Sequence, residues 1–383
     1  MRSRTKRVAA LAADAIASAL APLLVRRNRS ADIPASSRVL LIRCDHLGDA
    51  AMATSVLRPL RDALRPSVLD VLAGPWAIPI FEGHPAVDRV IPFAAPWWCA
   101  ARGASATARF SNWLNLPRVV REVRSRKYDV AIDLRGDLRQ IVLFLGLGGA
   151  PVRVSSDRTG GRSLLTHAWT HDASKHEVEK DFAIASLLGV VGTPRLDVPP
   201  PSVGAKRMSA LVSDEATSRG YVVLALHGSE PNRSWPAANA AALADRLFNE
   251  FGFVSVCLGA AADARAGDDV ATLANSPVTN LAGRTTITEA LSVLQRAAVT
   301  VAVDSGPMHL AAAVGCPVVA LFGPGDPRES GPWSTSARVV SEGAPCGCLN
   351  RRCDFVEGPG HCMRAIDTET VIDAVRAVLS ARS

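Results

Sequence analysis

Residues 299–327 read VTVAVDSGPMHLAAAVGCPVVALFGPGDP, and this stretch decides the fold class. Its first five residues are apolar and mostly β-branched, which is typical of a parallel strand buried on both faces. After Asp304, the residues Ser305, Gly306 and Pro307 begin a helix, because proline is tolerated in a first turn whose amides have no intrahelical partner. Gly315 and Pro317 stop that helix, and the apolar run behind them predicts another buried strand. The stretch therefore predicts a strand, helix and strand of a parallel α/β sheet.

The junction that starts at Asp304 is the first candidate ligand site. Ligands of open α/β sheets lie outside the carboxyl ends of the strands, and the amides and positive dipole end of a helix attract phosphate. The junction therefore predicts a nucleotide-diphosphate site formed by Asp304, Ser305, Gly306, Pro307, Met308 and His309. A structural interpretation stays open, in which Asp304 or Ser305 only caps the helix and His309 is a surface histidine.

The rest of the chain predicts two domains of the same class. At 383 residues with 48% hydrophobic content, the chain exceeds the usual size of a single core. Strands alternate with helices on both sides of a proline-rich linker, 194–205. We therefore expect an N-terminal domain over 37–193 and a C-terminal domain over 206–383, each an α/β doubly wound parallel sheet, facing one another across a cleft. The predicted strands lie within 37–44, 67–74, 87–93, 128–134, 221–229, 253–263 and 299–303, with a short strand within 271–297 and the strand behind Pro317. The helices include 116–126 and 175–189.

The N-terminal arm, 1–36, differs from the rest in charge. Its first 30 residues hold seven basic side chains and one acidic one, whereas the whole chain has a net charge of +7. A basic arm on a nearly neutral body argues against nucleic-acid binding and favours an anionic membrane surface. The apolar run 8–24 between the basic clusters is short for a spanning helix. It favours a helix lying at the interface, while a secretory signal and a disordered tail remain alternatives.

Eight cysteines in this length do not make a disulfide scaffold. Four are scattered in apolar surroundings and are interpreted as small core residues: Cys44, Cys99, Cys257 and Cys316. The others form C-x-C-x4-C-x8-C near the C-terminus and comprise Cys346, Cys348, Cys353 and Cys362. Four thiols in 17 residues predict a structural zinc or iron site. The alternative is a reduced or partly oxidised loop, because the first spacing is tighter than usual.

Three motifs together resemble the lipopolysaccharide heptosyltransferase family, glycosyltransferase family 9. They are IRCDHLGDAAMATSVLRPLR from residue 42, LALHGSEPNRSWP from residue 224, and DSGPMHLAAA from residue 304. The resemblance implies a GT-B fold and transfer of a sugar, such as heptose, from a nucleoside diphosphate, such as ADP-heptose, to a lipid-linked saccharide. Inversion at the anomeric carbon needs a base for the incoming hydroxyl and a stabiliser for the leaving diphosphate, without a catalytic cofactor.

The resemblance also assigns roles to residues. Asp49 matches the catalytic base, while its structural alternative is a helix N-cap. Arg233 stands where the family usually has a lysine. It keeps the positive charge, but its planar guanidinium differs from the compact ammonium group of lysine. Ser229 and Thr285 match donor-contacting hydroxyls. Asp304 matches a partner of the donor sugar, and His309 matches a partner of the donor phosphates.

The acceptor side is predicted less specifically. Four basic residues near predicted strand ends are candidates for anionic core sugars, with solvated surface charge as the alternative: Arg135, Arg139, Lys175 and His176. The chain contains no D-x-D triplet for a metal-bridged diphosphate. The sequence therefore predicts an inverting glycosyltransferase located peripherally at the inner face of the cytoplasmic membrane. The alternatives are the same fold with another sugar or a protein acceptor, and a non-catalytic nucleotide-sugar-binding module.

Overall fold

A computed structural model of the chain describes residues 33, 36–99, 106–228, 230–342 and 360–381. The chain divides into two compact units, Met1–Pro199 and Pro200–Ser383. The division falls within the stretch 194–205 that the sequence predicts as a linker. The N-terminal arm lies outside the described residues, apart from Ile33 and Ser36.

The first unit is built on a parallel six-stranded sheet with the order β3-β2-β1-β4-β5-β6. This is the doubly wound order, and its topological switch point lies between β1 and β4. Both central strands are buried along nearly their whole length, so their apolar residues form the core. The strands are β1 (Arg38–Arg43), β2 (Val68–Ala73), β3 (Arg89–Pro92), β4 (Val130–Asp133), β5 (Val152–Ser156) and β6 (His167–Trp169).

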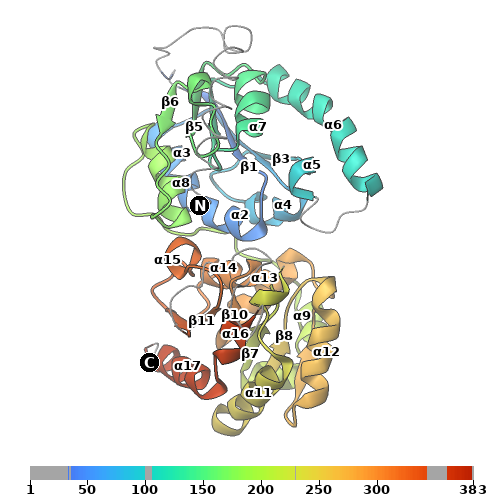
Figure 1. Ribbon diagram of the computed structural model, residues 1–383. Coiled ribbons are helices and arrows are strands. Elements are labelled where there is room, and N and C mark those ends of the chain that lie inside the picture. Colours follow the sequence, from blue (N-terminus) through green and yellow to red (C-terminus); the bar gives the residue numbers. More distant parts are fainter. Residues whose placement is uncertain (1–32, 34–35, 100–105, 229, 343–359, 382–383) are drawn as a thin grey trace. The chain divides into compact units, whose positions relative to one another are not determined.

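Helices surround the first sheet. Figure 1 shows α8 in green, which contacts α2 and η1, and α6 in turquoise beyond α5 and α7. In α8 a capping box begins the helix at His176. Phe93, Phe144 and the inner residues of α6 pack with β1 and β4 in one core cluster. The helices are α2 (Leu47–Ala53), η1 (Thr54–Val56), α3 (Leu57–Leu64), η2 (Pro75–Ala77), α4 (Ile78–Phe81), α5 (Pro96–Cys99), α6 (Ala106–Ser125), α7 (Leu138–Gln140), the π-helix η4 (Ile141–Gly146), η5 (Arg162–Leu164) and α8 (Glu177–Ser186).

The second unit repeats the same topology. Its parallel sheet has the order β12-β11-β10-β7-β8-β9, with the switch point between β7 and β10. The central strands β7 and β10 are buried throughout. The strands are β7 (Tyr221–Ala225), β8 (Val254–Cys257), β9 (Val278–Asn280), β10 (Val299–Val303), β11 (Val318–Phe322) and β12 (Ala337–Ser341).

The helices of the second unit close its core, in which Trp235 is fully buried and donates its indole N–H to the carbonyl of Ile366. Figure 1 shows α11 near α17 and α12, and contacts join α11 to both. The helices are α9 (Ala205–Leu211), α10 (Asp214–Arg219), η6 (Pro231–Arg233), α11 (Ala237–Phe251), η7 (Ala261–Asp263), α12 (Ala264–Leu273), α13 (Ile287–Arg296), α14 (Gly306–Ala313), α15 (Pro327–Ser330), α16 (His361–Ala365) and α17 (Thr368–Ser380).

The predicted fold class, α/β with two doubly wound parallel sheets, is confirmed. The predicted strands all occur, including β9 within 271–297 and β11 behind Pro317, and the sequence missed β5, β6 and β12. The predicted helix at 116–126 is longer than expected, because α6 already begins at Ala106. In the described parts of the chain, no helix has both the length and the apolar character that crossing a membrane requires.

Candidate active site

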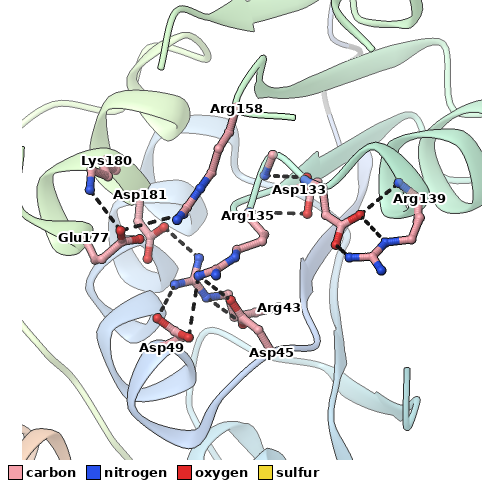
Figure 2. A network of polar contacts seen from close by, with 12 residues as sticks. Arg43, Asp45, Asp49, Asp133, Arg135, Arg139, Arg158, Glu177, Lys180 and Asp181 are labelled. Carbon is pink, nitrogen blue, oxygen red and sulfur yellow. Dashed lines mark hydrogen bonds and ion pairs between the residues drawn. The ribbon is translucent and has the colours of Figure 1, made fainter. Parts of the chain in front are cut away.

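A buried arginine, Arg43, organises the switch point of the first sheet. It is the last residue of β1, and its side chain has no exposed area. Nη1 donates to Oδ1 of Asp181 at 3.0 Å, and Nε lies 3.1 Å from Oδ1 of Asp45. Nη2 lies 3.3 Å from Oδ1 of Asp49. One guanidinium therefore holds three carboxylates in a fixed arrangement, as Figure 2 shows.

Asp49 is the member of this group that reaches solvent. Its side chain is 12% exposed, whereas those of Asp45 and Asp181 are fully buried. Asp49 is the third residue of α2, whose N-cap is His46, so the alternative of Asp49 as the N-cap is wrong. The sequence prediction thus places the candidate base at the carboxyl end of β1, where a substrate hydroxyl can approach it.

Arg135 is a second cation on the same carboxylates. Its Nη1 lies 3.2 Å from Oδ2 of Asp45 and 3.7 Å from Oδ2 of Asp49. The ring of Trp98 lies beneath the guanidinium at 5.1 Å, a cation–π contact. Arg135 was predicted as an acceptor contact, and the structure brings it directly beside the candidate base.

A tight turn after β4 sets the position of Arg135. The buried carboxylate of Asp133 accepts hydrogen bonds from the amides of Gly136 at 2.8 Å and Asp137 at 3.2 Å, and from the Ser155 hydroxyl at 2.8 Å. Gly136 has φ +67°, and a Cβ there would lie 2.1 Å from Oγ of Ser156. Only glycine can adopt this positive φ without strain and also leave the space that a Cβ would fill. Burial raises the pKa of Asp133 to about 7, despite these hydrogen bonds.

Burial and charge oppose each other in the group around Arg43. Burial raises the pKa of Asp45 to about 6, although Arg43 and Arg135 favour its charged form and lower it. Burial raises the pKa of Asp181 well above its usual range, again against the pull of Arg43. Burial alone would lower the pKa of Arg43, but the surrounding carboxylates raise it overall, so Arg43 stays a cation.

Further cations lie beyond Asp181, on and beside α8. Lys180 Nζ lies 2.9 Å from Oε1 of Glu177, and Arg158 Nη1 lies 3.7 Å from the same oxygen. Figure 2 shows these side chains beside Asp181. Burial, together with the nearby charges of Arg158 and Lys180, lowers the pKa of His171 to about 4, so His171 is neutral near pH 7. The cluster thus carries basic groups next to the candidate base.

The other predicted acceptor contacts lie apart from this cluster or have structural partners. Arg139 forms a two-point pair with Asp137, with its nitrogens 2.6 and 2.8 Å from the carboxylate, and its guanidinium lies over Trp97. Lys175 is exposed in the turn before α8. His176 is buried, and its Nδ1 accepts the amide hydrogen of Val178, which caps α8. This geometry argues against a direct acceptor contact from His176.

At the switch point of the second sheet, Arg233 and Asp304 form an ion pair. Nη1 of Arg233 lies 3.0 Å from Oδ2 of Asp304, and both side chains are partly exposed. Asp304 directly follows β10, and Arg233 ends η6 after β7. A Cβ on Gly325 would lie 2.7 Å from Oδ2 of Asp304, so glycine leaves room for that carboxylate. Two residues predicted as donor contacts are therefore adjacent.

The start of α14 lies beside this pair. Ser305 is its N-cap residue, but the hydroxyl donates to the carbonyl of Val303, and no side chain caps the helix. Its first-turn amides can therefore donate hydrogen bonds to an anion. The side chains of Met308 and His309 are buried, so Met308 contributes only main chain to this edge. Thr285 is half-buried in the loop between β9 and α13, and Ser229 lies outside the described residues.

Sequence reasoning missed most of the charged cluster around Asp49. The missed members are Arg43, Asp45, Arg158, Glu177, Lys180 and Asp181. Two signals were available. Arg43 is a charged residue directly after the apolar run 39–42 of β1, and Glu177 and Asp181 are four residues apart on one helix face.

The predicted metal site lies mostly beyond the part of the chain that the structure describes. Cys346, Cys348 and Cys353 are outside it, while Cys362 lies half-buried in α16. Among the described residues, no three histidine, cysteine or acidic side chains are grouped to hold a metal ion. Cys44, Cys257 and Cys316 are buried in the two cores, as predicted. The side chain of Cys99 is outside the description.

Sequence comparison with known proteins identifies a family of glycosyltransferases. Residues 116–356 match the family model described as glycosyltransferase family 9 (heptosyltransferase). Lipopolysaccharide heptosyltransferase 1 of Pseudomonas aeruginosa is 30% identical over 83% of this chain and 88% of its own. Lipopolysaccharide heptosyltransferase 2 of Salmonella typhimurium is 28% identical over 79% of this chain and 87% of its own.

A solved structure shows the same fold. The Escherichia coli ADP-heptose lipopolysaccharide heptosyltransferase II has a TM-score of 0.70 and 24% identity, and the match covers 90% of this chain and 99% of that one. The family model covers more than half of the chain, and the Pseudomonas relative matches most of it. The chain therefore belongs to glycosyltransferase family 9 and is a glycosyltransferase.

Proposed function

We propose that this glycosyltransferase moves a heptose from ADP-heptose to a lipopolysaccharide core or a related cell-surface glycan precursor, with inversion. The names of the relatives from Pseudomonas and Salmonella support the sugar and the acceptor class. The name of the Escherichia coli structure supports ADP-heptose as the donor. The observation that carries the mechanism is that, of the three carboxylates held by Arg43, Asp49 alone reaches solvent.

Asp49 acts as the general base. One oxygen of its carboxylate takes the proton from the acceptor hydroxyl while the hydroxyl oxygen attacks the anomeric carbon of the donor. The bond between that carbon and the diphosphate oxygen breaks, and its electron pair leaves with ADP. Arg43 and Arg135 hold the carboxylate in position before the acceptor arrives.

The second unit stabilises the leaving diphosphate. Arg233 and the first-turn amides of α14 supply positive charge where negative charge develops. Asp304 binds hydroxyls of the donor sugar, and its contact with Arg233 links sugar recognition to phosphate recognition. We assign Ser229, Thr285 and His309 to supporting contacts with the donor.

Acceptor recognition depends on the basic residues near the candidate base. Arg135 already contacts Asp49, so an anionic acceptor sugar there would lie next to the reacting hydroxyl. Arg139 and Lys175 remain candidates for more distant anionic groups. The arm 1–36, with its net positive charge, would place the enzyme at the inner face of the cytoplasmic membrane.

The cysteine cluster is proposed as a structural metal site. Cys346, Cys348, Cys353 and Cys362 supply soft thiolate ligands of the kind that zinc and iron prefer. Cys362 is in α16, close to Gly323 behind β11, because a Cβ on that glycine would lie 2.9 Å from the thiol sulfur. A metal there would fasten the C-terminal segment to the sheet. It takes no part in the proposed transfer.

The test is a donor and acceptor matrix. Purified protein is incubated with ADP-heptose, other ADP-sugars and UDP-sugars, each with and without a heptose-deficient lipopolysaccharide core, and product is followed by mass spectrometry. We expect transfer with ADP-heptose and the core acceptor only. Transfer of another sugar, or to a protein, would replace the proposed substrates, and donor binding without turnover would indicate a binding module.

A further inference from the structure

The outer face of α6 exposes large apolar side chains. The exposed fractions are 64% for Phe110, 52% for Trp113 and 66% for Leu114. In the described parts of the chain seven large hydrophobic residues are at least 36% exposed, and three of them fall in five consecutive positions here. Such a cluster on a helix surface indicates an interaction site, because scattered apolar side chains are normal and a grouped set is not.

The same helix has a distinct inner face. Asn112, Asn115, Val119 and Glu122 line a cavity of about 270 Å³ against Phe93 and its neighbours at the ends of β2 and β3. These positions recur every three or four residues, as one helix face requires. Phe110, Leu114 and Pro117 follow the opposite stripe. Trp113 lies beside these two faces, with its ring 6.0 Å from that of Trp97, and is still 52% exposed. Phe110 and Leu114 therefore face away from the core of their own unit, and Trp113 does so in part.

Basic side chains continue the exposed stripe toward the end of α6. Arg121 and Arg124 are exposed, whereas Arg118 lines the cavity of the inner face. The acidic residue of this helix, Glu122, is half-buried and paired with Arg126 at 2.9 Å. The outer face is thus apolar and aromatic in its first half and basic in its second half. In Figure 1 α6 lies at the outer side of the first unit, beyond α5 and α7.

We propose that this outer face of α6 docks the protein on an anionic lipid bilayer. Phenylalanine, tryptophan and leucine side chains insert at the boundary of headgroups and acyl chains, and arginines meet the lipid phosphates. The charged residues of the outer stripe, Arg121 and Arg124, are both positive, which favours an anionic bilayer over an apolar protein partner. Only the biological reason for this docking, a lipid-linked acceptor, rests on the proposed function.

The experiment uses the full chain and vesicles of equimolar phosphatidylglycerol and phosphatidylethanolamine, without donor or acceptor. The triple variant Phe110→Ser, Trp113→Ser, Leu114→Ser should bind at least about tenfold more weakly in sedimentation. Arg121→Gln and Arg124→Gln should each weaken binding about fivefold, and added salt should reduce these two effects. The control Leu187→Ser, Val191→Ser removes exposed apolar side chains elsewhere on the same unit and should bind like wild type.

A second readout separates this face from the N-terminal arm, which can also bind lipid. Brominated acyl chains should quench tryptophan fluorescence in wild type, and Trp113→Phe should remove most of that quenching. Unchanged vesicle binding by the triple variant, together with no quenching from Trp113, would overturn the proposal. A change in solution mass in the triple variant would also overturn it, because the face would then join protein chains.

Activity is measured separately on a soluble saccharide acceptor. The triple variant should transfer sugar to that acceptor as wild type does. If the vesicle results hold while no heptose transfer is found, the docking surface stands and the proposed function fails. If transfer is found while vesicle binding is unaffected by the substitutions, the proposed function stands and the docking surface fails.

Discussion

Nη2 of Arg43 lies 3.3 Å from Oδ1 of Asp49, and the same guanidinium contacts two carboxylates that have no exposed area. The arginine is fully buried, so its charge is compensated inside the protein and not by water. Asp49 is the outermost member of this arrangement. A base held in this way keeps its orientation before the substrate arrives, which is what general-base catalysis requires.

Replacing Asp49 by asparagine should abolish the base and leave the fold intact. Asparagine keeps the size of the side chain but cannot accept the proton of the acceptor hydroxyl, and such catalysis contributes about 10²- to 10⁴-fold in rate. We expect kcat to fall at least about a hundredfold, with the affinity for ADP-heptose nearly unchanged.

The measurement compares kcat, donor binding by calorimetry, and thermal unfolding of Asp49→Asn with wild type. The matched control is Asp62→Asn, an exposed aspartate on the neighbouring α3, which should retain wild-type kcat. Transfer by Asp49→Asn within a fewfold of wild type would assign a structural role to Asp49.

Removing Arg43 should destabilise the first unit strongly. Arg43→Met leaves the buried carboxylate of Asp181 without its cation and leaves Asp45 with Arg135 alone, and breaking a buried pair costs about 3 to 5 kcal/mol. Urea unfolding measures the loss. Adding Asp181→Asn to the variant should restore part of the stability, because one uncompensated charge is then gone.

The control for this prediction is an exposed ion pair in the same unit. Arg58 pairs with Asp197, and its side chain is 56% exposed. Arg58→Met should therefore change the free energy of unfolding by no more than about 1 kcal/mol. Equal losses in Arg43→Met and Arg58→Met would contradict the role of burial.

Asp133 should make the stability of the protein depend on pH. Burial raises its pKa in the folded state to about 7, while the unfolded chain has a value of about 3.9. Between about pH 4 and pH 7 the folded state keeps a proton that the unfolded state loses. This group therefore stabilises the fold fully at low pH, and its contribution falls by up to about 1.4 kcal/mol per pH unit as the pH rises through this window.

The comparison with Asp133→Asn isolates this effect, because asparagine does not titrate. Unfolding free energies of both proteins are measured from pH 4.5 to 7.5, a range chosen to cover about the window between the two pKa values. The stability of wild type relative to the variant should decrease steadily with pH. A difference that stays constant across the range would show that the folded-state pKa of Asp133 is not raised.

The fold could be predicted because the central strands of both sheets are continuous apolar runs. The missed strands lie toward the edges, where that signal fails. In β5 the sequence VRVSS hides a buried strand, because Arg153 donates to the carbonyls of Leu164, Ala150 and Pro151. Hydropathy along the chain cannot indicate that a guanidinium will find these partners. β6 has three half-buried residues, too few for a pattern.

The candidate site was predicted in part for a similar reason. Asp49 and Arg233 stand within compact motifs, so their position could be inferred from the local sequence. The contact between Arg43 and Asp181 joins residues 138 positions apart, and it forms because α8 packs on α2 and η1. Tertiary packing of that kind leaves no local pattern. Only the apolar strand that ends in arginine indicated an internal partner for Arg43.

The cysteine cluster gives a prediction that is independent of catalysis. Protein purified without oxygen should contain about one zinc or iron per chain, held by Cys346, Cys348, Cys353 and Cys362. Chelation should lower the unfolding temperature and leave donor affinity unchanged. Elemental analysis that finds neither metal in the purified protein would remove the site, and Cys257→Ser is the control, since that thiol is buried in the core away from the cluster.

Arg233 should matter most in the transition state. The diphosphate gains negative charge as its bond to the sugar breaks, so a cation placed there raises kcat as well as donor affinity. Arg233→Ala should therefore raise the KM for the donor and lower kcat together. Arg233→Lys should have constants between those of wild type and Arg233→Ala, because lysine keeps the charge but not the planar guanidinium that pairs with Asp304 at 3.0 Å. The control is Arg246→Ala, which breaks an exposed pair with Glu369 in the same unit and should leave both constants unchanged. Steady-state kinetics on the three variants test this role of Arg233. A higher KM at unchanged kcat in Arg233→Ala would show that Arg233 binds the donor equally in the ground and transition states. Wild-type values of both constants would place the diphosphate elsewhere.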